Sequence, residues 1–535
     1  MSRVPCMEAV VAVLESEGVD TVFGFPGAAV LPLYAALRRS SVRHVTMGRA
    51  AGGAHAAGGW ARATGNAGVC VAGSAGTDVI TGLRAALADS VPMICVTGQE
   101  PGIVEIAGPV TKWAVRPERP AQAPWIFREA FRVARSGRPG PVLVDLPADV
   151  QRGACHHDRA LDAPLPVELP RPLPQAVRRA VDLVGTAKRP LILAGGGVVT
   201  AGAGEELLDL AEHLQIPVQV TLMGRGAFPE DHPLFAGLAG PLARARWGNA
   251  VFLESDLVLA VGVRFDGRHA GDLGAYREGR RLVHVDIDPT QFGRVVEPDL
   301  GVFGHARPVL AEMVAEARSR TAALQPGRWV RRAGELCRTK ARRDDVPIKP
   351  PRAFREIDDF YPRDTTFVTA AGLHRIWPDG FPAACPPRRH LACGQAGWEV
   401  PAAMGAKCAH PERQVVAVAR RLPAEEVAVA ARHRIPFVIL LVDDGLPDER
   451  NDVHRGGARV DHVKAMESSG CPARRVERPE DLRDALAWAS REMARTRLPA
   501  LVEVMVERGA DTGPAPGAIK EFEPLPELVT VDWSD

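Results

Sequence analysis

Short apolar runs alternate with helical patterns in the first third of the chain. The apolar runs cover residues 21–24, 68–72, 93–97 and 142–145, and the helical patterns include 7–17 and 75–88. Buried strands that alternate with helices are typical of a parallel sheet with both faces covered. The pattern therefore predicts an α/β domain at the start of the chain.

The same pattern recurs twice more. Apolar runs at 190–194, 218–221, 257–261 and 282–286, with a helix at 204–214, form a second unit. Runs at 366–369, 415–418, 437–442 and 500–504 form a third. Pro-rich stretches at 163–174 and 346–351 separate the units and read as linkers, the second preceded by an Arg-rich helical stretch at 328–343. We predict three doubly wound parallel-sheet domains at 1–162, 175–345 and 352–510, followed by an extended tail at 511–535.

Composition narrows the class of protein. The 535 residues carry 66 basic and 65 acidic side chains, a net charge of +1, which implies no polyelectrolyte partner such as nucleic acid. The first residues lack the apolar core of a signal peptide, and no apolar run is long enough to span a membrane. Nine cysteines are scattered without a Cys-x-x-Cys pair, which predicts reduced thiols and a cytoplasmic location. The stretch 155–158, Cys-His-His-Asp, is expected to be polar linker and not a metal site.

Several segments resemble a known family. The stretch Phe23-Gly-Phe-Pro-Gly-Ala-Ala29 and residues 60–65, 94–99 and 136–147 are similar to acetolactate-synthase-like proteins, which use thiamine diphosphate. Residues 75–78, 221–224, 286–291, 393–397, 460–464 and 503–508 look most like the glyoxylate carboligases of that group. Those enzymes join two glyoxylates to form tartronate semialdehyde. The resemblance covers nearly the whole chain and implies a homodimer or homotetramer that acts on a small molecule.

The chain departs from this family where thiamine diphosphate and its Mg²⁺ are expected to bind. The family's Gly-Asp motif is replaced by Ala419-Arg420-Arg421, and its Asn-Asn pair by Asp443-Asp444. Mg²⁺ requires oxygen ligands, and losing one carboxylate at an effective dielectric near 20 costs roughly 4 kcal/mol. Thiamine diphosphate and Mg²⁺ are therefore predicted to be absent, with Asp444 as a weak metal candidate. Ala50 stands where most of the family has a catalytic glutamate and the glyoxylate carboligases have valine.

The middle domain keeps the segments that bind FAD in the family. The resemblance, together with a Gly triplet after a strand, predicts an FAD site. His305 stands where the family usually has Asp. The predicted FAD-binding residues are Gly195, Gly196, Gly197, Thr221, Leu222, Met223, Gly262, Arg264, Asp266, Arg268, Asp286, Ile287 and His305.

These observations favour a flavoprotein that has lost thiamine diphosphate chemistry and acts on an unidentified small molecule. We expect an oxidoreductase of specialised metabolism. Candidate catalytic residues are His55, Gln99, Lys112 and Gln395. One alternative is a thiamine-diphosphate-dependent carboligase of the glyoxylate carboligase type. Another is a non-catalytic subunit or scaffold.

Overall fold

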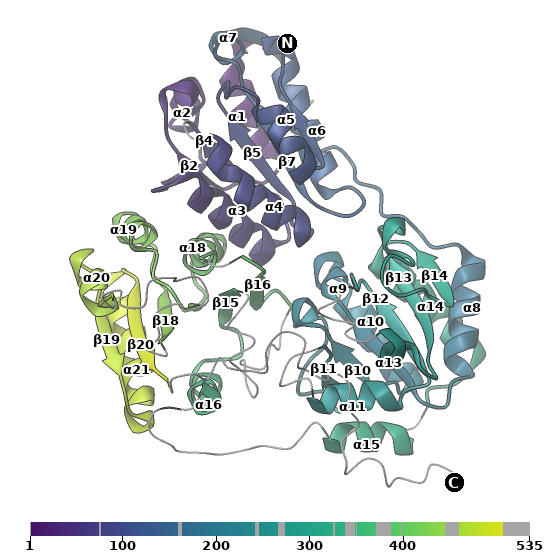
Figure 1. The fold of residues 1–535 in the computed structure, drawn as a ribbon. Coiled ribbons are helices and arrows are strands. Elements are labelled where there is room, and N and C mark those ends of the chain that lie inside the picture. Colours follow the sequence, from purple (N-terminus) through teal and green to yellow (C-terminus); the bar gives the residue numbers. More distant parts are fainter. Residues whose placement is uncertain are drawn as a thin grey trace.

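Three α/β domains, each built on a six-stranded parallel sheet, make up the protein (Figure 1). A computed structural model describes residues 2–73, 76–158, 163–240, 246–265, 273–324, 327–336, 348, 350–370, 387–395, 397–443 and 460–506. The predicted fold class is confirmed.

The first domain has the strand order β3-β2-β4-β5-β7-β6. The strands are β2 (Thr21–Phe25), β3 (Arg43–Thr46), β4 (Gly68–Ala72), β5 (Met93–Thr97), β6 (Trp113–Val115) and β7 (Pro141–Asp145). One face packs on α1 (Cys6–Ser16), α2 (Leu31–Leu37), α6 (Ala123–Arg135) and α7 (Ala148–Arg152), and the other on α3 (Ala50–Thr64), α4 (Ile80–Ala88) and α5 (Ile103–Ala107). The stretch expected to be polar linker is instead β8 (Ala154–His157), which pairs antiparallel with β1 (Ser2–Pro5).

The middle domain has a different order, β11-β10-β9-β12-β13-β14. Its strands are β9 (Pro190–Ala194), β10 (Val218–Val220), β11 (Phe235–Leu238), β12 (Leu257–Val261), β13 (Arg281–Asp286) and β14 (Leu300–Phe303). Helices α8 (Pro174–Gly185), α9 (Gly196–Ala201), α10 (Gly204–Leu214) and α14 (Ala306–Arg320) cover one face, and α11 (Arg246–Glu254), α13 (Leu273–Arg277) and α15 (Arg328–Leu336) the other.

The third domain has the order β16-β15-β17-β18-β20-β19. Its strands are β15 (Thr366–Ala370), β16 (His390–Cys393), β17 (Val415–Ala419), β18 (Val438–Asp443), β19 (Ala473–Val476) and β20 (Ala500–Met505). Helices α16 (Pro350–Phe360) and α21 (Pro479–Thr496) cover one face, and α18 (Glu399–Ala409), α19 (Ala424–Arg432) and α20 (His462–Ser468) the other. Counted in chain order, the first and third sheets share one strand arrangement, and the middle sheet has another.

Helices α3 and α18 lie against each other and join the first domain to the third (Figure 1). Their contact is unusually close because glycines meet backbone across it. A Cβ on Gly59 would lie 2.2 Å from the Ala402 carbonyl oxygen, and one on Gly405 would lie 1.9 Å from that of Ala56. One hydrophobic core runs from Phe23, through both helices, to strands β17 and β18.

The sequence pattern found the central strands and missed the edge strands. Strands β5 and β17 are buried at every position, whereas β6, β14 and β19 are half-buried or exposed at most positions. An edge strand has one neighbour and more solvent, so its apolar run is weaker.

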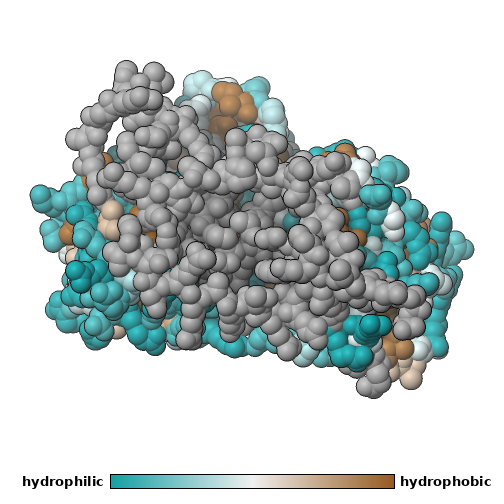
Figure 2. Space-filling model, turned by 60° about the horizontal axis from the view of Figure 1, so that its bottom comes forward, coloured by the Kyte–Doolittle hydropathy of each residue, from teal (hydrophilic) through white to brown (hydrophobic). Residues whose placement is uncertain are grey.

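None of the described helices is both long and apolar enough to cross a membrane. On the face shown in Figure 2, the described surface is mainly hydrophilic, and its apolar groups are small and separate.

Substituting Gly405→Ala is expected to lower the free energy of unfolding by about 2 kcal/mol or more, because the new methyl group meets the Ala56 backbone and the helices must separate. Chemical denaturation would measure this. The matched control is Gly185→Ala at the exposed end of α8, where a Cβ meets no atom within 4 Å. Equal losses in both variants would contradict the proposed close contact.

Candidate functional site

Charged side chains gather where strands of the third sheet end. Strand β17 is followed directly by Arg420 and Arg421, and the neighbouring strand β18 ends at Asp443. The strands are parallel, so these ends meet at one edge of the sheet. Ligands of open α/β sheets bind at this carboxyl edge.

Two further ligand-type side chains lie beside Asp443. Glu503 comes from the middle of β20, where it pairs with Leu441, and His462 opens α20. One potential ligand atom from each of Asp443, His462 and Glu503 lies within 4.8 Å of the others. Two carboxylates and an imidazole at this spacing are a possible metal-binding set.

An arginine supports the most deeply buried member of this set. The Glu503 side chain is 0% exposed, and its Oε2 accepts a hydrogen bond from Arg475 Nε at 2.7 Å. Arg475 also reaches Asp461, whose side chain accepts a hydrogen bond from the Lys464 backbone N–H. This network fixes the start of α20 against β19 and β20.

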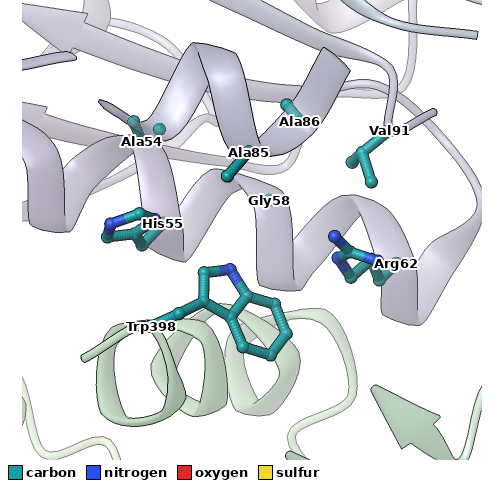
Figure 3. A pocket seen from close by; sticks show the side chains of 9 residues that line it. Ala54, His55, Gly58, Arg62, Ala85, Ala86, Val91 and Trp398 are labelled. Atoms are coloured by element: carbon teal, nitrogen blue, oxygen red, sulfur yellow. The ribbon is translucent and has the colours of Figure 1, made fainter. Parts of the chain in front are cut away.

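A small cavity lies between α3, α4 and the start of α18 (Figure 3). His55 and Arg62 extend from α3 toward Trp398, and the Arg62 guanidinium lies 5.2 Å from the centroid of the Trp398 ring. The cavity volume is about 10 Å³, close to the lower limit for one water molecule. The described cavity is therefore too small for a substrate. Burial lowers the pKa of His55 to about 4, so its imidazole is neutral at pH 7.

A buried carboxyl group lies near Ala50, the position of the family's glutamate. Ala50 is the first residue of α3, and a Cβ on Gly52 in the same turn would lie 1.9 Å from Glu426 Oε1 of α19. Glu426 is 5% exposed. Burial, and then the nearby charge of Glu425, raise the pKa of Glu426 to about 7, while Arg49 acts in the opposite direction.

The other candidate catalytic residues are mostly engaged in structural contacts. Gln99 has a φ of +53° and accepts a hydrogen bond from the Ala148 backbone N–H at 3.1 Å. Lys112 Nζ donates to the Val133 and Ser136 carbonyl oxygens, both at 2.5 Å, and burial lowers its pKa to about 8. Gln395 is half-buried just beyond β16, at the same carboxyl edge as Arg420. These candidates do not form one cluster.

In the middle domain, the Gly triplet is explained by packing of backbone on backbone. A Cβ on Gly195 would lie 2.1 Å from the Gly262 carbonyl oxygen, and one on Gly197 would lie 2.6 Å from Gly262 Cα. A Cβ on Gly196 would lie 3.2 Å from Met223 Cβ. The glycines bring the loops after β9 and β12 together, so packing by itself requires small residues at these positions.

Most of the remaining predicted FAD-binding residues have local partners. Thr221 accepts from Gly224 N–H at the turn that holds Leu222 and Met223, and Arg264 donates to the Ala88 carbonyl oxygen of the first domain. Asp286, followed by half-buried Ile287, accepts from Asp288 N–H, and His305 caps α14 by accepting from Arg307 N–H. Asp266, Arg268 and the metal candidate Asp444 lie outside the described residues.

Sequence reasoning missed Glu426, His462 and Glu503 as possible site residues. His462 and Glu503 lie in segments that carried the family resemblance, at 460–464 and 503–508. Nothing in their spacing shows that they approach Asp443, because α20 and β20 are brought together by the fold. Glu426 looks like an ordinary acidic residue in the first turn of a helix.

Replacing Glu426 with Gln is expected to stabilise the protein at pH 8 and to change little at pH 4. The folded-state pKa of about 7 lies above the ordinary 4.5, so stability is lost as pH rises through this range. A shift of that size corresponds to about 3 kcal/mol above pH 7. Thermal unfolding at both pH values would measure the difference.

The exposed Glu425 on the same helix provides the control, Glu425→Gln, which should change stability less. If Glu426→Gln has the same effect at pH 4 and pH 8, the carboxyl group is not held protonated.

Comparison with known proteins places these elements in a family. Three family profiles match in order: the N-terminal TPP binding domain of thiamine pyrophosphate enzymes at 6–105, their central domain at 177–313, and their C-terminal TPP binding domain at 370–504. A glyoxylate carboligase of Escherichia coli O157:H7 is 40% identical over 98% of this chain and 97% of its own length. A probable acetolactate synthase large subunit of Methanocaldococcus jannaschii is 36% identical over 94% of this chain and 91% of its own length. An acetolactate synthase of Mycobacterium bovis is 33% identical over 95% of this chain and 89% of its own length.

These matches contradict the main functional prediction, an FAD-binding enzyme that has lost thiamine diphosphate and Mg²⁺. Both TPP binding domains are matched, and the relatives are a carboligase and synthases of that class. The prediction rested on the replaced Gly-Asp and Asn-Asn motifs, and these local changes do not outweigh matches that cover nearly the whole chain. The chain belongs to the thiamine pyrophosphate enzyme family and resembles its glyoxylate carboligases and acetolactate synthases.

Proposed function

We propose that this protein is a thiamine-diphosphate-dependent carboligase that acts on glyoxylate. One glyoxylate loses CO₂, and its former carbonyl carbon forms a bond to the aldehyde carbon of a second glyoxylate, with uptake of one proton. The product is tartronate semialdehyde. The observation that supports this most strongly is the 40% identity to a glyoxylate carboligase over 98% of the chain.

Residues at the carboxyl edge of the third sheet fit the charged end of the cofactor. Arg420 and Arg421 directly follow β17 and bring positive charge to the edge where a diphosphate would lie. Asp443, at the end of the adjacent strand, offers a carboxylate oxygen for a divalent cation. In the rest of the family, a metal ion held by the Gly-Asp carboxylate brings positive charge to the diphosphate. In this proposal Arg420 and Arg421 provide part of that positive charge.

Thiamine diphosphate would supply the nucleophilic carbanion and the electron sink that this decarboxylation requires. In this proposal the chain's own residues bind the cofactor and orient the substrate. Ala50 is 3% exposed and provides no carboxylate, so any proton transfer at that position requires another group. Gln395 is the candidate for a substrate contact because it lies at the same edge as Arg420.

The remaining candidates, His55, Gln99 and Lys112, would position neighbouring backbone in this proposal. Assembly as a homodimer or homotetramer belongs to the proposal too, because the sites of the resembled family lie between the first domain of one subunit and the third of another. A cytoplasmic location is part of it as well.

We expect the purified protein, supplied with thiamine diphosphate and a divalent cation, to release CO₂ from glyoxylate and to form a three-carbon semialdehyde. Coupled reduction of the product and ¹³C NMR of labelled glyoxylate would detect both. Release of CO₂ from pyruvate instead would indicate an acetolactate-type reaction. No turnover of either substrate, together with no rise in melting temperature on adding the cofactor, would support a non-catalytic subunit and overturn the proposal.

Replacing both Arg420 and Arg421 with Gln is expected to weaken thiamine diphosphate binding about tenfold or more, because each charge-assisted contact contributes roughly 1.5–3 kcal/mol. Isothermal titration calorimetry would measure the dissociation constant. Arg432→Gln, at the exposed far end of α19, is the matched control and should bind as the unmodified protein does. Equal affinity in all three proteins would show that these arginines do not hold the diphosphate.

A further inference from the structure

Asp443, His462 and Glu503 come from three separate elements and converge on one point. Strands β18 and β20 are adjacent, and α20 begins at His462 beside them. The three potential ligand atoms lie within 4.8 Å of one another. Three protein ligands about 2.1 Å from a shared metal ion lie roughly 3.4 Å apart, so shortening the distances between the ligand atoms by at most about 1.4 Å would form the site.

The surroundings favour a cation at this point. Glu503 is fully buried, and one of its carboxylate oxygens lies within 4.8 Å of a carboxylate oxygen of Asp443, so a cation between them would reduce the repulsion of like charges. The described residues include one positive charge in contact with Glu503, that of Arg475, which donates to Glu503 Oε2. Arg475 also forms an ion pair with Asp461. Lys464, a further cation at this end of α20 among the described residues, is 80% exposed and pairs with Asp461.

The imidazole ring of His462 provides separate support for a bound metal ion. His462 Nδ1 is buried and has no hydrogen-bond partner within the described part of the chain. A buried ring nitrogen normally has a hydrogen-bond partner or binds a metal. A metal ion bound through Nδ1 and seated between the two carboxylates would also satisfy this ring.

We propose that Asp443, His462 and Glu503 form a binding site for a divalent transition metal such as Mn²⁺, Co²⁺ or Zn²⁺. Imidazole is a preferred ligand of these ions, whereas Mg²⁺ favours oxygen ligands and retains its waters. Glu503 coordinates through one carboxylate oxygen while the other stays with Arg475. Water completes the coordination.

This site extends the proposed function, because Asp443 lies at the edge assigned there to the cofactor. In the combined proposal the enzyme selects a transition metal over Mg²⁺. The two proposals are tested separately, since metal binding is measured on the protein without thiamine diphosphate and without substrate. Metal binding without carboligation would leave the site in place and remove only the proposed function.

The test is Mn²⁺ binding to chelator-treated full-length protein, followed by electron paramagnetic resonance. We expect about one tightly bound Mn²⁺, with electron spin echo modulation from a directly coordinated ¹⁴N nucleus. His462→Gln should remove the nitrogen modulation, and Asp443→Asn should weaken Mn²⁺ binding about tenfold or more. Mg²⁺ should compete poorly for the bound Mn²⁺.

Glu467→Gln is the matched control, because Glu467 is an exposed carboxylate on the same helix as His462 and lies outside the set. Circular dichroism and melting temperature without metal would establish that each variant is folded. The proposal is overturned if the unmodified protein binds no Mn²⁺, if nitrogen modulation persists in folded His462→Gln, or if folded Asp443→Asn binds as tightly as the control.

Discussion

The close contact of α3 with α18 is the constraint on which the rest of the structure depends. Gly59 and Gly405 let backbone meet backbone, so the first and third domains share one hydrophobic core that reaches from Phe23 to Ile439. The middle domain has its own cores and is tied to the others by polar contacts, such as those of Arg388 with the Arg62 and Thr200 carbonyl oxygens. Two domains with the same strand order thus form one packed unit.

The shared core determines which ionisable side chains are buried and which lie at the sheet edge. Glu426 is buried where α19 meets the first turn of α3, and the raised pKa of its carboxyl group follows from that burial. His55 is kept neutral in the same region. At the opposite extreme, Arg420, Arg421 and Asp443 lie at the carboxyl edge of the third sheet, where charge can meet a ligand. The fold thus buries titrating groups at the domain contact and leaves others at the sheet edge, where they are available for binding.

The altered Gly-Asp and Asn-Asn positions have a consistent physical interpretation. A diphosphate and its cation need a balance of positive charge and oxygen ligands, and this balance can be met by more than one set of residues. Here arginines follow β17, and a carboxylate ends β18 beside His462 and Glu503. Asp443 and the two arginines lie at the ends of adjacent strands, at one edge of the sheet. Loss of a familiar motif therefore changes how a ligand would be held and does not by itself remove the function.

The sequence by itself determined the three α/β domains and their central strands, because fully buried strands such as β5 and β17 need uninterrupted apolar runs. It also determined the family, through similarity spread over nearly the whole chain. Only the tertiary structure decided that the Gly triplet packs against Gly262, that Glu426 is buried, and that Asp443, His462 and Glu503 converge. Apolar periodicity reports each residue's own environment, whereas these features depend on which distant segments meet.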